Sequence, residues 1–329
     1  MHRKVTSSVV STQSLSQIFV SFPCNLKIMQ TPEIHVLDIR FLDVPHVIAN
    51  YLIPSNDGLI LVETGPVTAF EHLKQAIADE GFDRKDVRHV LLTHIHFDHA
   101  GAAWKFADNG AKIYVHPIGV PHLNNPEKLW NSAKRIYQDD MERLWGEMQP
   151  IDRELLVPID DRQIFDIGGV EFQAFYTPGH AVHHNAYKLG DVVFTGDVAG
   201  VSIDNGPAVP PCPPPDIDIE LWKNSIDTVL SLHPKTLYLA HFAKIEHPEE
   251  HLNNLKKMLD DWKNWMEPYF DKGTAVETII PKFVAYTQNQ LRELGCSEAQ
   301  IDQYEKGNPS FMSVTGLLRY WKLKTEGRI

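Results

Sequence analysis

Residues 93–101 read Thr-His-Ile-His-Phe-Asp-His-Ala-Gly and follow an apolar run, Val90 to Leu92, that is typical of a buried strand. Three imidazoles and one carboxylate fall within six positions of this stretch: His94, His96, Asp98 and His99. Imidazole and carboxylate groups are common ligands of transition metals. The stretch therefore predicts a metal site at the C-terminal end of a strand.

The spacing of these residues suggests room for two ions. Side chains two positions apart on an extended segment point the same way, so His94 and His96 can reach one metal. Asp98 and His99 then face a neighbouring position. The alternative is a group of surface histidines in a polar loop, because the chain has 17 His in all. Four potential ligands in six residues after a strand favour the metal site.

Three later stretches place further potential ligands near the ends of expected strands. A Pro-Gly turn pair after a strand-like run precedes His180. A glycine, which lets the backbone bend, precedes Asp197. His241 follows a third apolar run. Each of these alone is more often a plain turn or a core histidine, so only their combination indicates a site.

In this order, the four stretches resemble the motifs of the metallo-β-lactamase superfamily of metallohydrolases, over about residues 45–245. Four motifs in order are far more specific than any one of them. The resemblance implies a site for two metal ions. The implied ligands of the first ion are His94, His96 and His180, and those of the second are Asp98, His99 and His241, with Asp197 between the two ions.

Strand and helix signals alternate along the chain, which predicts the α/β class. Two groups of strands separated by helices suggest two sheets packed face to face with helices outside. The resemblance implies the same arrangement, a four-layer αβ/βα sandwich with a C-terminal helical extension. Two expected helices are a segment at 68–81, opened by a capping box, and a long helix at about 126–148.

Three regions are expected along the sequence. Residues 1–32 contain no Asp or Glu and are interpreted as a disordered extension, or as the result of a start assigned upstream of Met29. Organellar targeting is the weaker interpretation, because the run lacks several arginines. Residues 33–245 are expected to form the metallo-β-lactamase-like domain. Residues 246–329 are expected to be helical, with aromatic residues that pack in the core.

Two segments are expected to lie beside the site. The aromatic residues of the 126–148 helix are expected to form one wall of a substrate pocket, opposite the C-terminal helices. The proline-rich stretch 207–215 cannot be a helix or a central strand, so a stiff extended loop near Asp197 is expected.

Composition limits the classes of partner. The net charge of −12 argues against a nucleic-acid partner, because phosphate binding needs clustered Lys and Arg. No apolar stretch is long enough to span a bilayer, so no membrane partner is expected. Three widely spaced cysteines favour a reducing compartment, and a cytoplasmic location is expected. The expected partner is a small-molecule substrate, and a homodimer is compatible with the sequence.

The resemblance implies a binuclear hydrolase similar to glyoxalase II and the lactonases. In such an enzyme, a hydroxide that bridges two divalent ions cleaves a carboxylic ester, thioester or lactone. Asp98 is the expected catalytic residue, which orients the hydroxide and accepts its proton. Zinc is the expected metal, and iron and manganese are alternatives because His and carboxylate ligands suit all three.

Two other classes of enzyme are alternatives. Some members of the superfamily that the chain resembles are persulfide dioxygenases, with one iron held by two His and one carboxylate. In this chain His94, His180 and Asp197 would supply such a triad. A metal-dependent nuclease needs a basic groove, and the acidic balance of the chain argues against it. The number of bound metals separates the hydrolase from the dioxygenase.

Four more polar residues are candidates for supporting the site. His183, His184 and Tyr187 are each interpreted either as groups that contact a ligand or the substrate, or as packing residues. Glu63 occupies a position where many relatives carry Asp, so support of a ligand by a longer side chain is expected there.

Overall fold

The computed structural model describes residue 2 and residues 32–329. Residues 32–329 belong to one compact unit. The N-terminal extension predicted for residues 1–32 lies outside the described residues, apart from positions 2 and 32. No helix in the described part of the chain is long and apolar enough to cross a bilayer.

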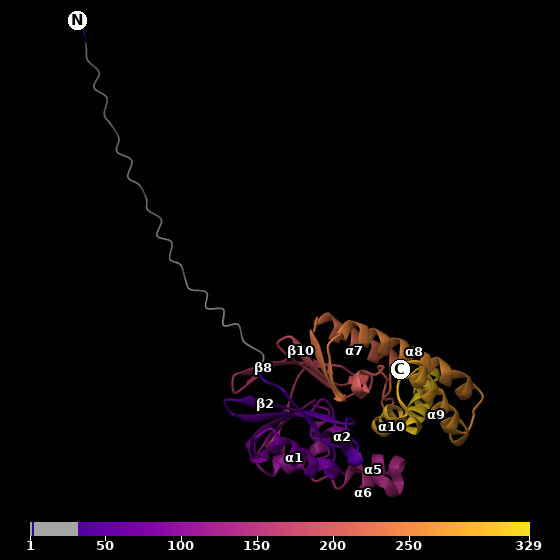
Figure 1. Ribbon diagram of the computed structural model, residues 1–329, viewed down its shortest axis with the longest axis horizontal. Coiled ribbons are helices and arrows are strands. Elements are labelled where there is room, and N and C mark those ends of the chain that lie inside the picture. The colour runs from indigo at the N-terminus through magenta and orange to yellow at the C-terminus, as the bar shows by residue number, and fades with distance from the viewer. Residues whose placement is uncertain (1, 3–31) are drawn as a thin grey trace. The chain divides into compact units, whose positions relative to one another are not determined.

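Two six-stranded sheets form the centre of the unit (Figure 1). The strands of the first sheet, in the order β1-β2-β3-β4-β5-β6, are His35–Asp38, Ala49–Ser55, Gly58–Val62, Val87–Leu91, Lys112–Val115 and Leu156–Pro158. The second sheet has the order β12-β11-β10-β9-β8-β7, and from β7 to β12 its strands are Ile164–Ile167, Val170–Tyr176, Asn185–Leu189, Val192–Val201, Thr236–His241 and Ala243–Ile245. Strand β4 runs parallel to β3 and β5, and β10 runs parallel to β11.

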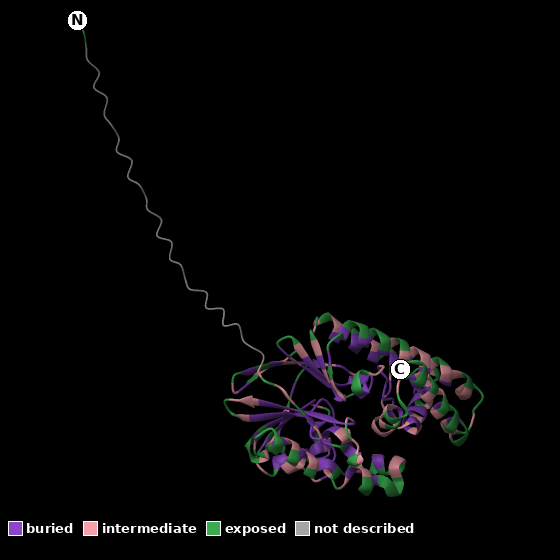
Figure 2. Ribbon diagram, in the orientation of Figure 1, coloured by how far each residue is buried: buried purple, intermediate pink, exposed green. Residues whose placement is uncertain are grey.

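Helices cover the outer face of each sheet, which gives the unit four layers. The core between the sheets contains Tyr51 from the first sheet and Phe172 and Phe194 from the second. Helices α1 (Phe70–Asp79) and α3 (Ala103–Ala107) pack on the first sheet, and α7 (Ile219–Ser231) and α8 (Pro248–Asp271) pack on the second. Figure 2 shows buried strands between helices whose outward sides are exposed. The predicted four-layer αβ/βα sandwich is confirmed.

The C-terminal region is helical, as predicted. After α8 come α9 (Val276–Glu293), α10 (Glu298–Gly307) and α11 (Ser310–Thr325), and α11 contacts both α8 and α9. Trp262, Phe283 and Tyr320 are buried in the same cluster as Trp222 of α7. The aromatic residues of this region therefore serve as core anchors. The division of residues 33–245 and 246–329 into separate domains stays a prediction.

The single helix predicted at about 126–148 is wrong. Helix α5 (Glu127–Tyr137) stops before Gln138, which has a positive φ of 49°. The shorter α6 (Met141–Trp145) follows a 3-10 turn. Neither Gly nor Pro lies at the break, so the sequence carries no stop signal there. The break brings the rings of Tyr137 and Trp145 to a centroid distance of 5.1 Å.

The capping box expected at residues 68–71 is also wrong. The Thr68 hydroxyl donates instead to the carbonyl oxygen of Leu144, at 2.7 Å, and α1 begins at Phe70 without a side-chain cap. The Thr68 hydroxyl therefore makes a tertiary hydrogen bond instead of the helix cap that the local sequence pattern predicted.

The proline-rich stretch 207–215 is extended, as predicted, and the C-terminal helices hold it in place. It contains no helix, and its one bridge pairs Val209 with Val201. The Asn308 side chain donates to the Pro210 carbonyl at 3.1 Å, and Arg319 donates to the Pro215 carbonyl at 2.8 Å. The position of this loop therefore depends on the C-terminal region.

The turn before His180 gives a test of the fold. Gly179 has φ +127°, and a Cβ there would lie 2.3 Å from the Trp222 backbone. Gly179→Ala should lower the free energy of unfolding by about 2 kcal/mol or more, because strain and overpacking add. Urea unfolding measures this loss.

The matched control is Gly273→Ala. Gly273 also has a positive φ, +60°, but no atom lies within 4 Å of a Cβ added there. This variant should lose only about 1 kcal/mol, from backbone strain. Equal losses in the two variants would contradict the close packing of α7 against the turn.

Candidate metal centre

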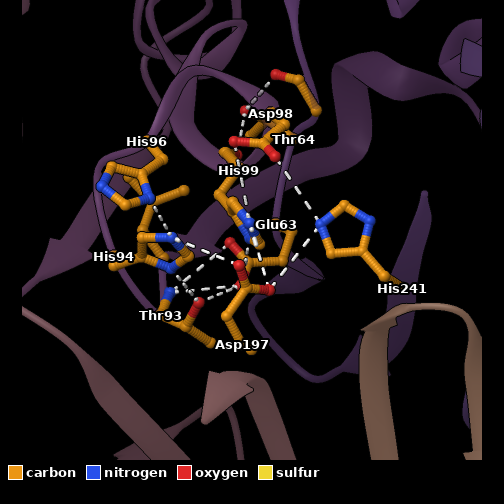
Figure 3. Close-up of polar contacts among 12 residues, drawn as sticks. Glu63, Thr64, Thr93, His94, His96, Asp98, His99, Asp197 and His241 are labelled. Carbon is orange, nitrogen blue, oxygen red and sulfur yellow. Dashed lines mark hydrogen bonds and ion pairs between the residues drawn. The ribbon is translucent and has the colours of Figure 1, made fainter. Parts of the chain in front are cut away.

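The seven potential ligands come together from the ends of three strands, the middle of a fourth strand and one short helix. Figure 3 labels all of them except His180. His94 and His96 follow β4, Asp98 and His99 lie in α2 (Phe97–Ala100), His180 follows β8, Asp197 lies within β10, and His241 ends β11. Residues separated by up to 147 positions in the sequence, from His94 to His241, thus share one site.

The first group of ligands is His94, His96 and His180. The Nδ1 atom of His96 lies 2.9 Å from Nε2 of His94 and 3.1 Å from Nε2 of His180. One ring nitrogen of each residue therefore points to a common centre. This is the set of three that the resemblance implies for the first ion.

The second group is Asp98, His99 and His241. Oδ1 of Asp98 lies 3.8 Å from Nε2 of His99, and Oδ2 lies 3.6 Å from Nε2 of His241. The three ligand atoms lie within 4.8 Å of one another. This is the set predicted for the second ion.

Asp197 lies between the two groups. Its Oδ2 atom is 3.3 Å from Nε2 of His180, and its Oδ1 atom is 3.5 Å from Nε2 of His99 and 3.7 Å from Nε2 of His241. Figure 3 shows the carboxylate with His94 on one side and His241 on the other. Each carboxylate oxygen thus faces a different group of histidines.

Buried polar atoms without partners show that this donor set fits divalent metal ions. Both ring nitrogens of His99 and Oδ1 of Asp197 are buried and have no hydrogen-bond partner in the described chain. Burying such atoms without a partner destabilises the fold, so a bound ligand such as a metal ion is expected there. Imidazole nitrogens with carboxylate oxygens are the donors that zinc, iron and manganese accept.

Hydrogen bonds to the far side of three rings set their orientation. His180 donates from Nδ1 to the Pro211 carbonyl at 2.9 Å, and His241 donates from Nδ1 to the Val47 carbonyl at 2.8 Å. Nδ1 of His94 lies 3.1 Å from the Thr93 hydroxyl oxygen. Each bond leaves Nε2 free to bind a metal, which is the usual arrangement around protein metal sites.

Glu63 supports two ligands at once. Its carboxylate accepts a hydrogen bond from the Thr93 hydroxyl, and Oε1 lies 3.4 Å from Nδ1 of His99. Thr93 therefore links Glu63 to His94. The supporting role predicted for Glu63 agrees with this geometry. No role was predicted for Thr93, the first residue of the 93–101 stretch.

Burial decides the pKa values of His94 and His96 in the first group, whereas nearby carboxylates decide that of His99 in the second. Burial lowers the pKa of His94 well below its usual value and that of His96 to about 3, which favours neutral rings. Burial opposes protonation of His99 as well, but the carboxylates of Asp197, Asp98 and Glu63 outweigh it and raise the pKa of His99. Positive charge is thus stabilised next to the carboxylates, where a cation would bind.

Three further predicted residues have different surroundings. His184 is buried, and its Nε2 accepts from the Asp197 backbone N–H at 3.1 Å, while Nδ1 lies 2.7 Å from the Thr177 hydroxyl. His183 is buried beside the cavity next to the site, and Tyr187 donates to the Leu92 carbonyl at 2.9 Å within the core between the sheets. His184 therefore positions Asp197, and Tyr187 is a packing residue.

The family model of the metallo-β-lactamase superfamily matches residues 44–241, which include all seven candidate ligands. The chain belongs to the metallo-β-lactamase superfamily. The predicted family is therefore confirmed, and with it the predicted class, a metal-dependent hydrolase.

Relatives of this superfamily resemble the chain over most of its length. The metallo-β-lactamase fold-containing protein ST1585 of Sulfurisphaera tokodaii is 28% identical over 265 residues, covering 79% of this chain and 96% of that protein. Its crystal structure matches with a TM-score of 0.59 at 27% identity, over 70% of this chain and 87% of that one. The metallo-β-lactamase family protein TTHA1429 of Thermus thermophilus gives a TM-score of 0.63 at 20% identity, over 90% and 94% of the two chains, and shows the fold.

A third relative matches over a shorter range. An atrochrysone carboxyl ACP thioesterase of Aspergillus chevalieri is 32% identical over 152 residues, covering 45% of this chain and 38% of the fungal protein. The chain thus spans well under half the length of that thioesterase.

Replacing Glu63 tests the support that it gives to the metal centre. Glu63→Gln keeps the size of the side chain but removes the charge that faces His99, so metal affinity should fall by about 10- to 100-fold. Competition with a chromophoric chelator measures the affinity.

Glu80→Gln is the control for this variant, because Glu80 pairs with His35 at an exposed site outside the centre. It should leave the affinity unchanged. A Glu63→Gln variant with the affinity of the unmodified protein would show that the carboxylate does not act on His99.

Proposed function

We propose that the chain is a hydrolase of carboxylic esters, thioesters or lactones that uses two divalent metal ions, one in each group of ligands. The observation that carries this proposal is the position of Asp197, whose two oxygens face His180 on one side and His99 and His241 on the other. A carboxylate shared in this way suits two adjacent cations better than one. We propose zinc as the physiological metal.

The candidate metal centre opens onto a cavity that a substrate could enter. A cavity of about 910 Å³ is lined by His96, Asp98 and His241, whereas His94 and His99 are fully buried. This volume is near the upper end of the range for small-molecule sites, about 300–1,000 Å³. We therefore propose a small-molecule substrate that approaches the face of the centre formed by Asp98.

The residues of the chain divide the chemistry among them. Two divalent ions held here would supply a water molecule that ionises near neutral pH and would polarise the carbonyl of the substrate. His99 and His241 outweigh burial and lower the pKa of Asp98 to about 2, so its carboxylate is ionised. The Asp98 side chain is 24% exposed, and it is thus placed to orient that water and accept its proton.

The relatives support hydrolysis of an ester-type or thioester bond but do not identify the substrate. The fungal relative is named a thioesterase. No cysteine occurs among the seven candidate ligands, which agrees with hard or borderline metal ions. We propose the ester, thioester and lactone group as a whole on these grounds.

Metal content measured together with hydrolysis tests the proposal. Protein purified without added metal should contain about two divalent ions per chain by elemental analysis, and it should hydrolyse members of a panel of thioesters, esters and lactones. One iron per chain, no hydrolysis and oxygen uptake with a persulfide would overturn the proposal in favour of a dioxygenase.

Removing a ligand from one group should distinguish the roles of the two ions. His241→Ala should retain one tightly bound ion and lose at least about 100-fold in kcat/KM, because only the second group loses a ligand. His72→Ala is the control, because His72 lies in α1 and contacts Asp43 outside the centre. Full activity in His241→Ala with one ion bound would contradict a role for the second ion.

A further inference from the structure

The cavity beside the metal centre has an aromatic wall built from three parts of the fold. The rings of Phe41 and Trp145 stack with centroids 5.6 Å apart, and Tyr137 lies edge-on to Trp145 at 5.1 Å. Phe311 of α11 lies 6.3 Å from Tyr137. All four residues line the cavity. In Figure 1, α5 and α6 lie on the same side of the sandwich as α10, and residues of all three helices line the space between them.

This wall reaches the metal centre directly. Phe97 lines the cavity, lies 6.2 Å from Trp145, and is the chain neighbour of both His96 and Asp98. One substrate molecule could therefore pack a side group against the aromatic wall while its carbonyl lies at the metal centre. The wall and the centre form one binding site.

The rim of the cavity is apolar as well. Ile118 and Val182 line the cavity and are 46% and 47% exposed, which is unusual for large apolar side chains. Pro213 and Pro214 also line it. A small polar substrate would leave this surface in water, whereas an apolar chain would cover it.

Several charged residues of the lining already have partners. Arg143 pairs with Asp140 at 2.9 Å, and Lys306 pairs with Asp302 at 2.5 Å. Glu305 accepts a hydrogen bond of 2.6 Å from the Ser310 hydroxyl. These three charges have partners within the protein. Lys128, Arg135 and Asp216 also line the cavity, beside the apolar walls that are available to a ligand.

We infer that the substrates are acyl compounds with a large apolar acyl group, which packs against the aromatic wall while its carbonyl lies at the metal centre. This inference rests on the proposed function. Substrates with a short acyl group, such as acetyl thioesters, are poor ones because they leave the wall uncovered.

Binding of the carboxylate products tests the inference without turnover. In a series of straight-chain carboxylates from acetate upward, measured by calorimetry on the metal-loaded protein, affinity should rise about fourfold per methylene until the cavity is filled. The corresponding series of thioesters should show the same trend in kcat/KM. A flat series in both measurements would overturn the inference.

A variant that fills the cavity tests where the acyl group lies. Ser132 and Lys134 are both on α5, but only Ser132 lines the cavity. Ser132→Trp should lower the ratio of long-chain to short-chain kcat/KM by at least about tenfold, equivalent to displacing two methylenes. Lys134→Trp should leave the ratio unchanged.

Ile136 also lines the cavity, so Ile136→Trp is a second variant that fills it, for use if Ser132→Trp does not fold. An unchanged ratio in a folded, filled variant would overturn the inference. Hydrolysis without preference for chain length would do the same and leave the proposed function standing. Protein that contains two metal ions and hydrolyses neither this series nor any member of the panel of thioesters, esters and lactones would instead overturn the proposed function, and the inference with it.

Discussion

A buried carboxylate that faces two groups of histidines is the constraint on which the site depends. Asp197 is 2% exposed, and an ionised carboxylate at such a position costs several kcal/mol unless it is compensated. The rings of His180, His99 and His241 lie within 3.7 Å of its oxygens. This compensation requires the ends of β4, β8 and β11 to meet at the middle of β10, and the pairing of two sheets face to face brings them there.

The C-terminal helices take part in this arrangement although they supply none of the seven ligands. They hold the proline-rich loop through Asn308 and Arg319, and the carbonyl of Pro211 in that loop orients the ring of His180. Phe311 of α11 completes the aromatic wall of the cavity. The same helices therefore act on both the metal centre and the space for the substrate.

Much of the fold and of the candidate site could be predicted from the sequence, because short apolar runs followed by turn residues indicate where strands end. His94, His180 and His241 each follow an apolar run, and the structure places each of them where a strand or its turn ends. The break in the 126–148 helix could not be predicted, because Gln138 takes its positive φ without a Gly or Pro signal. The carbonyls that orient His180 and His241 carry no sequence signal either, since any residue type supplies the same group.

Anomalous diffraction from crystals of the metal-loaded protein tests the central claim most directly. The account predicts two peaks per chain, one among His94, His96 and His180 and one among Asp98, His99 and His241, with the Asp197 carboxylate between them. A single peak at saturating metal, with Asp197 bound on one side only, would contradict a centre built for two ions.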